Sequence, residues 1–243
     1  MLVSSNAAFA LDTVFPGAPS TGELQLTSTL TKLAGEDTAR SVEEFIEPDE
    51  PINWILYVPE SYTPDRPAGL MVFISPNNSG DIPSRWKSVL DEHNVIWISA
   101  RGSGNQTIVT RRALFALLAA NVASRDYRIN KDRVFVSGFS GGSKVAGMVA
   151  AEYPHIFKGA IFMGGIIPLE DHPPRKYTVF RHNRFVFISG MDDHARDSTR
   201  RVHRQYIDIG VLNSELIEIA GVGHKRPEPR FLESAIVYLD ATE

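Results

Sequence analysis

The feature that most constrains the fold of this chain is a strand, a tight glycine-containing turn and a helix that follow one another directly. Residues 133–137 (RVFVS) form an apolar, β-branched run that predicts a buried strand. A helical pattern then spans residues 141–152 and stops before Pro154. Only the turn Gly138-Phe139-Ser140-Gly141-Gly142 connects the two, which indicates a βα unit whose strand and helix backbones pack closely.

The rest of the chain repeats this alternation of short apolar runs and helical patterns, which predicts an α/β fold with a mostly parallel central sheet. Two early segments differ from this pattern. Residues 24–32 alternate polar and apolar side chains, and residues 52–58 follow an acidic loop, so both are expected to be antiparallel edge strands. The expected antiparallel strands are 24–32 and 52–58; the expected parallel strands are 69–74, 94–99, 133–137, 159–163, 184–189 and 215–220; the expected long helices are 107–123, 141–152 and 228–239.

Composition narrows the function classes. The chain of 243 residues is 43% hydrophobic, and no linker or repeat interrupts its middle, so we expect one domain over residues 21–243. A net charge of −4 gives no reason to expect nucleic acid as a partner, and no apolar run is long enough to span a membrane. The absence of cysteine excludes disulfides, thiolate chemistry and cysteine metal sites.

The first 20 residues have two interpretations. They form either a flexible tail or the remnant of an export signal, since Ala8-Phe9-Ala10 has the small-x-small form of a signal-peptidase site. The second interpretation is slightly favoured, so a secreted or periplasmic location is expected over a cytoplasmic one.

The turn matches the pattern G-x-S-x-G, which is typical of a nucleophilic serine. A serine on a sharp strand-to-helix turn exposes its hydroxyl above the sheet edge, and Ser140 holds that position. The following helix directs N–H groups and its positive dipole end at the site, which favours a developing oxyanion. The alternative is a strand-to-helix loop with only a structural role.

Residues 133–165 resemble the nucleophile-elbow region of α/β-hydrolases, and are most similar to compact feruloyl-esterase and polyhydroxyalkanoate-depolymerase-like serine esterases. The likeness extends over about residues 54–239. It implies the α/β-hydrolase fold, with helices on both faces of the sheet and little or no cap domain. It also implies a catalytic triad in the order Ser, Asp or Glu, His.

This order selects the two partners of Ser140. The acid usually lies three residues after a glycine that ends a strand, which selects Asp193 after Gly190, with Asp192 as the alternative. A purely structural role for both aspartates would be to cap the helix that begins near Ala195. Of seven histidines, only His224 follows the last predicted strand and precedes the final helix. The other histidines beside these motifs, His155 and His194, are expected on the surface.

An oxyanion hole needs two preorganised donors. The first is expected from the backbone N–H of Gly141. The second should come from the loop after residues 69–74, where Pro76 has no N–H, so Asn77 is expected and Asn78 is the alternative. The residues expected to line the substrate pocket are Asn78, Gly102, Ser103 and Phe139.

The sequence therefore predicts a serine hydrolase that cleaves carboxylic esters through an acyl-enzyme. No metal and no organic cofactor is implied. The expected partner is a small-molecule or polymeric ester, and the sequence carries no signal for an oligomeric state. Residues 164–183 are the only candidate for a lid, and this segment is short. The alternatives are a serine peptidase, an acyltransferase and, from another class, a binding module without catalysis.

Overall fold

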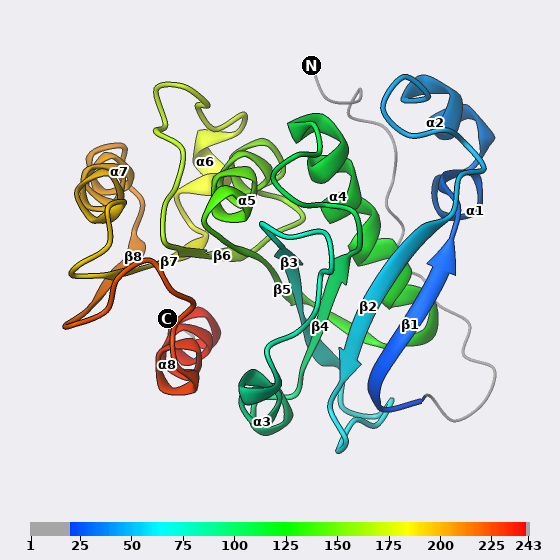
Figure 1. Cartoon of the computed structure of the whole chain (residues 1–243), viewed down its shortest axis with the longest axis horizontal. Coiled ribbons are helices and arrows are strands. Elements are labelled where there is room, and N and C mark those ends of the chain that lie inside the picture. The colour runs from blue at the N-terminus through cyan, green and yellow to red at the C-terminus, as the bar shows by residue number, and fades with distance from the viewer. Residues whose placement is uncertain (1–19, 242–243) are drawn as a thin grey trace.

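An eight-stranded sheet runs through the molecule in the computed structural model, which describes residues 20–241 (Figure 1). The strand order is β1-β2-β4-β3-β5-β6-β7-β8. The pairs β1–β2 and β2–β4 are antiparallel, whereas all the other pairs are parallel. The strands are β1 (Gly22–Ser28), β2 (Ile52–Val58), β3 (Ala68–Ile74), β4 (Val95–Ala100), β5 (Ile129–Phe139), β6 (Gly159–Met163), β7 (Arg184–Gly190) and β8 (Asn213–Ile219). This arrangement confirms the predicted mostly parallel sheet with antiparallel N-terminal strands.

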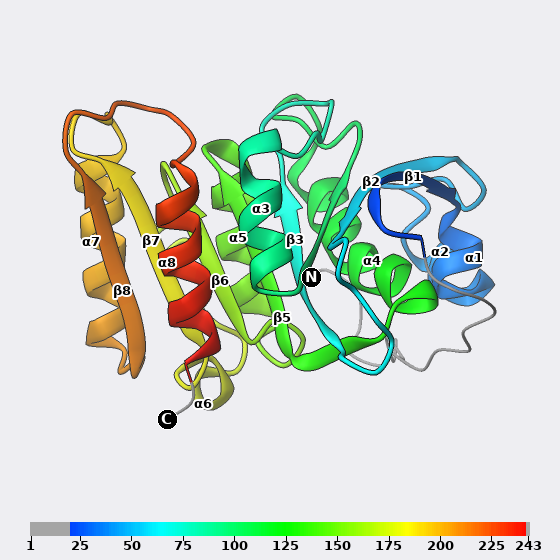
Figure 2. The same ribbon diagram turned by 90° about the horizontal axis from the view of Figure 1, so that it is seen from below.

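Helices cover both faces of the sheet, as predicted. The helices α3 and α8 lie on one face, and α4, α5 and α7 lie on the other (Figures 1 and 2). Every residue of β3, β4 and β6 is buried because these strands are covered on both sides. The helices are α1 (Leu30–Ala34), α2 (Glu36–Ser41), α3 (Lys87–Glu92), α4 (Val109–Asp126), α5 (Gly141–Glu152), α6 (Tyr177–Phe180), α7 (Arg196–Asp208) and α8 (Pro229–Asp240), with a 3-10 turn η1 (Ser84–Trp86).

The sheet divides the apolar interior into two clusters. Trp54 and Phe162 belong to the cluster on the side of α4 and α5. Trp86 and Trp97 belong to the cluster beneath α3 and α8. Burial of this apolar surface on both sides fixes the positions of the strand ends, where the loops that carry the candidate site begin.

The predicted strand over residues 24–32 was too long. β1 ends at Ser28, because the side chain of Thr29 accepts a hydrogen bond from the N–H of Lys32 (3.3 Å) and so caps helix α1. The polar–apolar alternation continues past this cap, so periodicity alone did not reveal the boundary.

The segment over residues 164–183 packs against the body of the molecule. Ile166, Leu169 and Phe180 are buried, and the N–H of Arg175 donates to the carbonyl of Ala151 in α5 (3.0 Å). Within residues 20–241, nothing forms a separate cap over the sheet edge, which agrees with the expected minimal cap. In the same part of the chain, no helix has the length and apolar character needed to cross a membrane. The proposed tail or signal remnant, residues 1–20, lies almost entirely outside the described residues.

Candidate active site

Ser140 lies between the last residue of β5 and the first residue of α5, at the edge where the parallel strands end. Its backbone has φ 56° and ψ −124°, a left-handed φ that non-glycine residues rarely adopt. Two contacts hold this conformation: the Ser140 N–H donates to the carbonyl of Met163 (2.8 Å), and the Ser140 carbonyl accepts from the N–H of Ser143 (3.0 Å). Such strain costs on the order of 1–3 kcal/mol and persists only where the surroundings enforce it.

The glycines on each side of Ser140 have no room for a side chain. A Cβ atom on Gly142 would lie 1.9 Å from the carbonyl oxygen of Ile74, at the end of the neighbouring strand β3. A Cβ atom on Gly138 would lie 2.5 Å from the carbonyl oxygen of Gly142. These approaches confirm the predicted close packing of the strand and helix backbones, and they show why neither position can carry a side chain.

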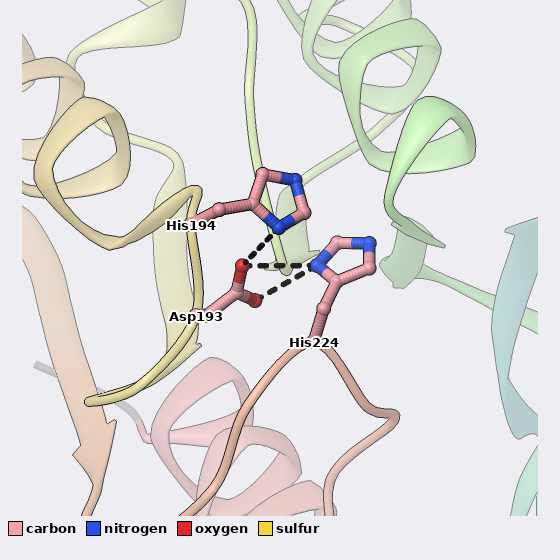
Figure 3. Close-up of side chains that lie close together, drawn as sticks. All are labelled: Asp193, His194 and His224. Carbon is pink, nitrogen blue, oxygen red and sulfur yellow. Dashed lines mark hydrogen bonds and ion pairs between the residues drawn. The ribbon is translucent and has the colours of Figure 1, made fainter.

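The imidazole of His224 bridges Ser140 and Asp193. Its Nε2 lies 2.9 Å from the hydroxyl oxygen of Ser140. Its Nδ1 lies 3.0 and 2.9 Å from the two carboxylate oxygens of Asp193 (Figure 3). The Asp193 side chain is 1% exposed and that of His224 is 28% exposed, so the acid is buried while the base is reached from solvent. Three side chains that are far apart in the sequence thus meet within hydrogen-bonding distance.

Asp193 also serves the structural role that was considered as an alternative. Its Oδ1 accepts a hydrogen bond from the N–H of Ala195 (2.8 Å), at the start of α7. The neighbouring Asp192 is exposed, and no hydrogen bond links its carboxylate to His224 in the described part of the chain. The geometry therefore favours Asp193 over Asp192 as the partner of His224.

The loops that carry Asp193 and His224 are tied together. The N–H of Asp192 donates to the carbonyl of Val222 (3.0 Å), and a Cβ atom on Gly190 would lie 1.9 Å from the same carbonyl oxygen. Within the histidine loop, the N–H of Lys225 donates to the carbonyl of Gly223 (2.8 Å) and makes a tight turn around His224. This close packing fixes the imidazole relative to the carboxylate.

His194 lies beside this group, although the sequence analysis predicted only a surface position for it. Its side chain is 77% exposed, as predicted for a surface residue, yet its Nδ1 is 3.4 Å from the Oδ1 of Asp193. The rings of His194 and His224 are 4.5 Å apart (Figure 3). The only sequence feature that could have indicated this contact is the position of His194 directly after Asp193.

Two backbone N–H groups were predicted as oxyanion donors. The N–H of Gly141 has no acceptor among the described residues, as expected at the start of a helix. The N–H of Asn77 donates to the hydroxyl of Ser75 (3.0 Å). Asn77 thus lies in the expected loop with its N–H engaged, and its use as a donor stays a prediction.

The carboxamide of Asn105 lies against Gly141, a contact that the sequence did not reveal. A Cβ atom on Gly141 would lie 2.2 Å from Oδ1 and 3.0 Å from Nδ2 of Asn105. The backbone N–H of Asn105 donates to the carbonyl of Pro76 (2.9 Å), which fixes this residue beside the loop after β3. The carboxamide can occupy this position because Gly141 has no side chain.

Three of the predicted pocket residues lie in these loops, and the fourth packs on the histidine. The carboxamide oxygen of Asn78 accepts from the N–H of Gly104 (2.9 Å), and its carbonyl accepts from the N–H of Gly102 (2.8 Å). The ring of Phe139 lies 4.9 Å from that of His224. Contact of these four residues with substrate stays a prediction.

A buried arginine joins the two loops that follow β3 and β4. The guanidinium of Arg112 donates to the carbonyl of Ser103 (2.7 Å) and to that of Ser75 (3.0 Å). Burial lowers the pKa of Arg112 from its usual value. The predicted pocket residue Ser103 is itself buried, with its hydroxyl donating to the carbonyl of Ala100 (2.8 Å). Arg112 therefore fixes the backbone beside the site.

Comparison with known proteins shows which fold the chain has. No protein-family model matches the sequence. No curated protein matches it either.

Solved structures share the fold of this chain at low sequence identity. FphF, a fluorophosphonate-binding serine hydrolase of Staphylococcus aureus, has a TM-score of 0.64 at 13% identity, covering 90% of this chain and 99% of its own. The S-formylglutathione hydrolase FrmB of S. aureus has a TM-score of 0.61 at 12% identity, with 92% and 96% covered. Est1E of Butyrivibrio proteoclasticus has a TM-score of 0.57 at 15% identity, with 76% and 91% covered. The chain has the α/β-hydrolase fold that these proteins share.

Proposed function

We propose that this chain is a serine hydrolase that cleaves carboxylic esters through an acyl-enzyme intermediate. One observation carries the proposal: the His224 imidazole lies 2.9 Å from the Ser140 hydroxyl and 2.9 Å from the buried carboxylate of Asp193. A serine hydroxyl is a weak nucleophile at neutral pH and needs such an adjacent base.

In the proposed reaction, Nε2 of His224 takes the proton of Ser140 while the serine oxygen attacks the ester carbonyl. The carboxylate of Asp193 holds the proton on Nδ1, so Nε2 keeps a free lone pair, and it stabilises the imidazolium that forms. The imidazolium then gives its proton to the leaving alcohol as the C–O bond breaks. A water molecule, deprotonated by the same imidazole, releases the acid and restores Ser140.

The tetrahedral oxyanion would be held by the N–H of Gly141 and by a second donor. The free N–H of Gly141 supports the first assignment. For the second donor, the sequence favours the N–H of Asn77, and the carboxamide of Asn105 is a further candidate because it lies against Gly141. Removing one such donor costs about 10²–10³ in kcat in a well-studied protease.

The structural neighbours agree with this class of reaction. FphF is named as a serine hydrolase, and FrmB as an S-formylglutathione hydrolase. At 12–15% identity, these structures support only a shared fold. The proposed activity therefore rests on the contacts of Ser140, Asp193 and His224. Small-molecule or polymeric esters are the proposed substrates, since the described residues form no separate cap over the site.

The test is the variant Ser140→Ala, assayed with a simple aryl ester and with a fluorophosphonate label. We expect kcat to fall on the order of 10⁶ and labelling to disappear, because the nucleophile is lost. Ser143→Ala is the matched control, since its buried hydroxyl on the first turn of α5 has no hydrogen-bond partner within residues 20–241. Persistent labelling of Ser140→Ala would overturn the proposal.

The reaction class is then resolved with a panel of substrates. Ester, amide and polyester substrates with varied acyl chains separate an esterase from a peptidase, and added alcohols reveal acyl transfer. We expect turnover of esters, with water as the main acceptor.

A further inference from the structure

His194 adds a second imidazole to the pair formed by Asp193 and His224. We propose that these three residues form a binding site for Zn²⁺ or a similar transition-metal ion, and that the bound ion inhibits the hydrolase. The inhibition rests on the proposed function, whereas the binding of the metal does not.

The geometry of the three side chains carries this proposal. One ligand atom from each residue lies within 4.8 Å of the other two, and Figure 3 shows both imidazoles directed at the carboxylate. The Oδ1 of Asp193 is 3.0 Å from Nδ1 of His224 and 3.4 Å from Nδ1 of His194. Ligand atoms around a tetrahedral Zn²⁺ at about 2.0–2.1 Å lie about 3.3 Å from one another. Small rotations of the rings therefore bring all three atoms to coordination distance.

The chemistry of the ligands and their exposure also suit a metal ion. Two imidazole nitrogens and one carboxylate oxygen are a common zinc ligand set, which leaves a fourth position for water. The His194 side chain is 77% exposed, so an ion reaches the group from solvent and this ring is free to adjust. The buried carboxylate of Asp193 supplies the negative charge.

A metal ion at this site would disable the base. Coordination uses the lone pair of Nδ1, so His224 carries its proton on Nε2 instead. Nε2 then has no lone pair to accept the proton of Ser140, although it lies 2.9 Å from that hydroxyl. The ion also occupies the carboxylate that would stabilise the imidazolium. Binding and catalysis are therefore mutually exclusive.

A second group of possible ligands provides a control. Glu92, His93 and Glu233 also come together, with 3.9 Å between the ring of His93 and the carboxylate of Glu233. Only one of these three residues is a histidine, so this group offers one nitrogen and two carboxylate oxygens, whereas the group of Asp193 offers two nitrogens and one oxygen. Zn²⁺ binds both kinds of ligand. The experiment must therefore separate the two groups.

Binding is measured on the full chain carrying Ser140→Ala, which keeps all three ligands and cannot turn over substrate. Equilibrium dialysis should show that this chain binds Zn²⁺. Adding His194→Ala should weaken the affinity for Zn²⁺ at least about tenfold, since removing even a residue that only hydrogen-bonds to a metal ligand costs about 10–100-fold in affinity. Adding Glu233→Gln or His182→Ala, the latter an exposed imidazole elsewhere, should leave this binding unchanged. Nitrogen NMR of His224 should report a shift of its proton from Nδ1 to Nε2. Equal binding with and without His194, or loss of binding with Glu233→Gln alone, would overturn the site.

Inhibition is measured on the wild-type chain after chelation and re-addition of Zn²⁺. Ester turnover and fluorophosphonate labelling should both fall at least about tenfold and recover with a chelator, while His182→Ala responds as the wild type does. Bound zinc without inhibition would overturn the inhibitory role. A chain that binds zinc through His194 but hydrolyses no ester would keep the site and overturn the proposed function, so the two failures are distinguishable.

Discussion

At the scale of single residues, Gly142 sets how closely α5 approaches the sheet. The variant Gly142→Ala should lower the free energy of unfolding by about 3 kcal/mol, because the new methyl group would lie 1.9 Å from the Ile74 carbonyl and backbone must move. Urea unfolding measures this loss. Gly223→Ala is the control, since its nearest new contact would be 3.8 Å, and it should change stability little. Equal losses in both variants would contradict the packing described for the turn.

The variant Asn105→Ala tests whether the carboxamide of Asn105 is the second oxyanion donor. If its carboxamide donates, Asn105→Ala should lower kcat for an aryl ester about 10²-fold with little change in KM, because the interaction forms only in the transition state. Steady-state kinetics measure both constants, with the exposed neighbour Gln106→Ala as the control. An unchanged kcat would leave the N–H of Asn77, with Asn78 as its alternative, as the candidate donor.

At the scale of elements, two ion pairs connect α7 to the edge strand β8. Glu218 on β8 accepts from Arg196 (2.8 Å) and from Arg200 (2.5 Å) on α7. Hydrogen bonds from Arg200 and Arg196 lower the pKa of Glu218 below its usual value of 4.5. The folded state therefore favours the ionised carboxylate, and this linkage stabilises the position of the helix that follows Asp193.

This linkage predicts a pH-dependent effect of Glu218→Gln. A carboxyl group whose pKa is lowered by folding stabilises the protein above its unfolded pKa and loses that contribution as the pH falls through the folded pKa. Glu218→Gln should therefore cost about 1 kcal/mol at pH 7, and this difference from the wild type should shrink below about pH 4.5. Thermal unfolding from pH 7 to pH 3 measures it. The exposed Glu228→Gln should show no such trend, and a difference that grows in acid would contradict the assignment.

The sequence predicted elements well where one physical signal dominated. The fully buried strands such as β6 and the long helix α5 have predicted and observed bounds that agree, because a continuous apolar run and a glycine-bounded helical pattern mark their ends. The short helices α1, α2, α3 and α6 escaped prediction, since four to six residues are too few to show a helical period.

The same limit applies to the candidate site. The resemblance to α/β-hydrolases implied the order Ser, Asp or Glu, His, and Ser140, Asp193 and His224 fit that order because each follows a predicted strand. The neighbours His194 and Asn105 were not found in this way. Their positions depend on a ring orientation and on the empty space at Gly141, which exist only after the loops have packed.

At the scale of the whole molecule, the loop that carries His224 is held by a residue from the first half of the chain. The indole N–H of Trp86 donates to the carbonyl of Pro227 (3.1 Å), which is 141 residues away in the sequence. The side chain of the preceding Arg85 donates to the carbonyl of Arg226 (3.0 Å). Both contacts lie two to three residues after His224, so Arg85 and the buried Trp86 anchor the loop that carries the base.

The variant Trp86→Phe tests whether this anchor reaches the chemistry. It keeps an aromatic ring in the buried cluster but leaves the carbonyl of Pro227 without its donor, which should cost about 1–3 kcal/mol of stability. Because the loop then positions His224 less well, kcat for an aryl ester should fall more than KM rises. Trp97→Phe is the matched control, since Trp97 lies in the same cluster, is equally buried, and its indole N–H has no acceptor in the described part of the chain. Urea unfolding and steady-state kinetics on both variants separate the effect of the hydrogen bond from the effect of packing. An equal loss of kcat in both variants would assign the effect to the lost ring volume. The hydrogen bond to Pro227 would then have no part in catalysis.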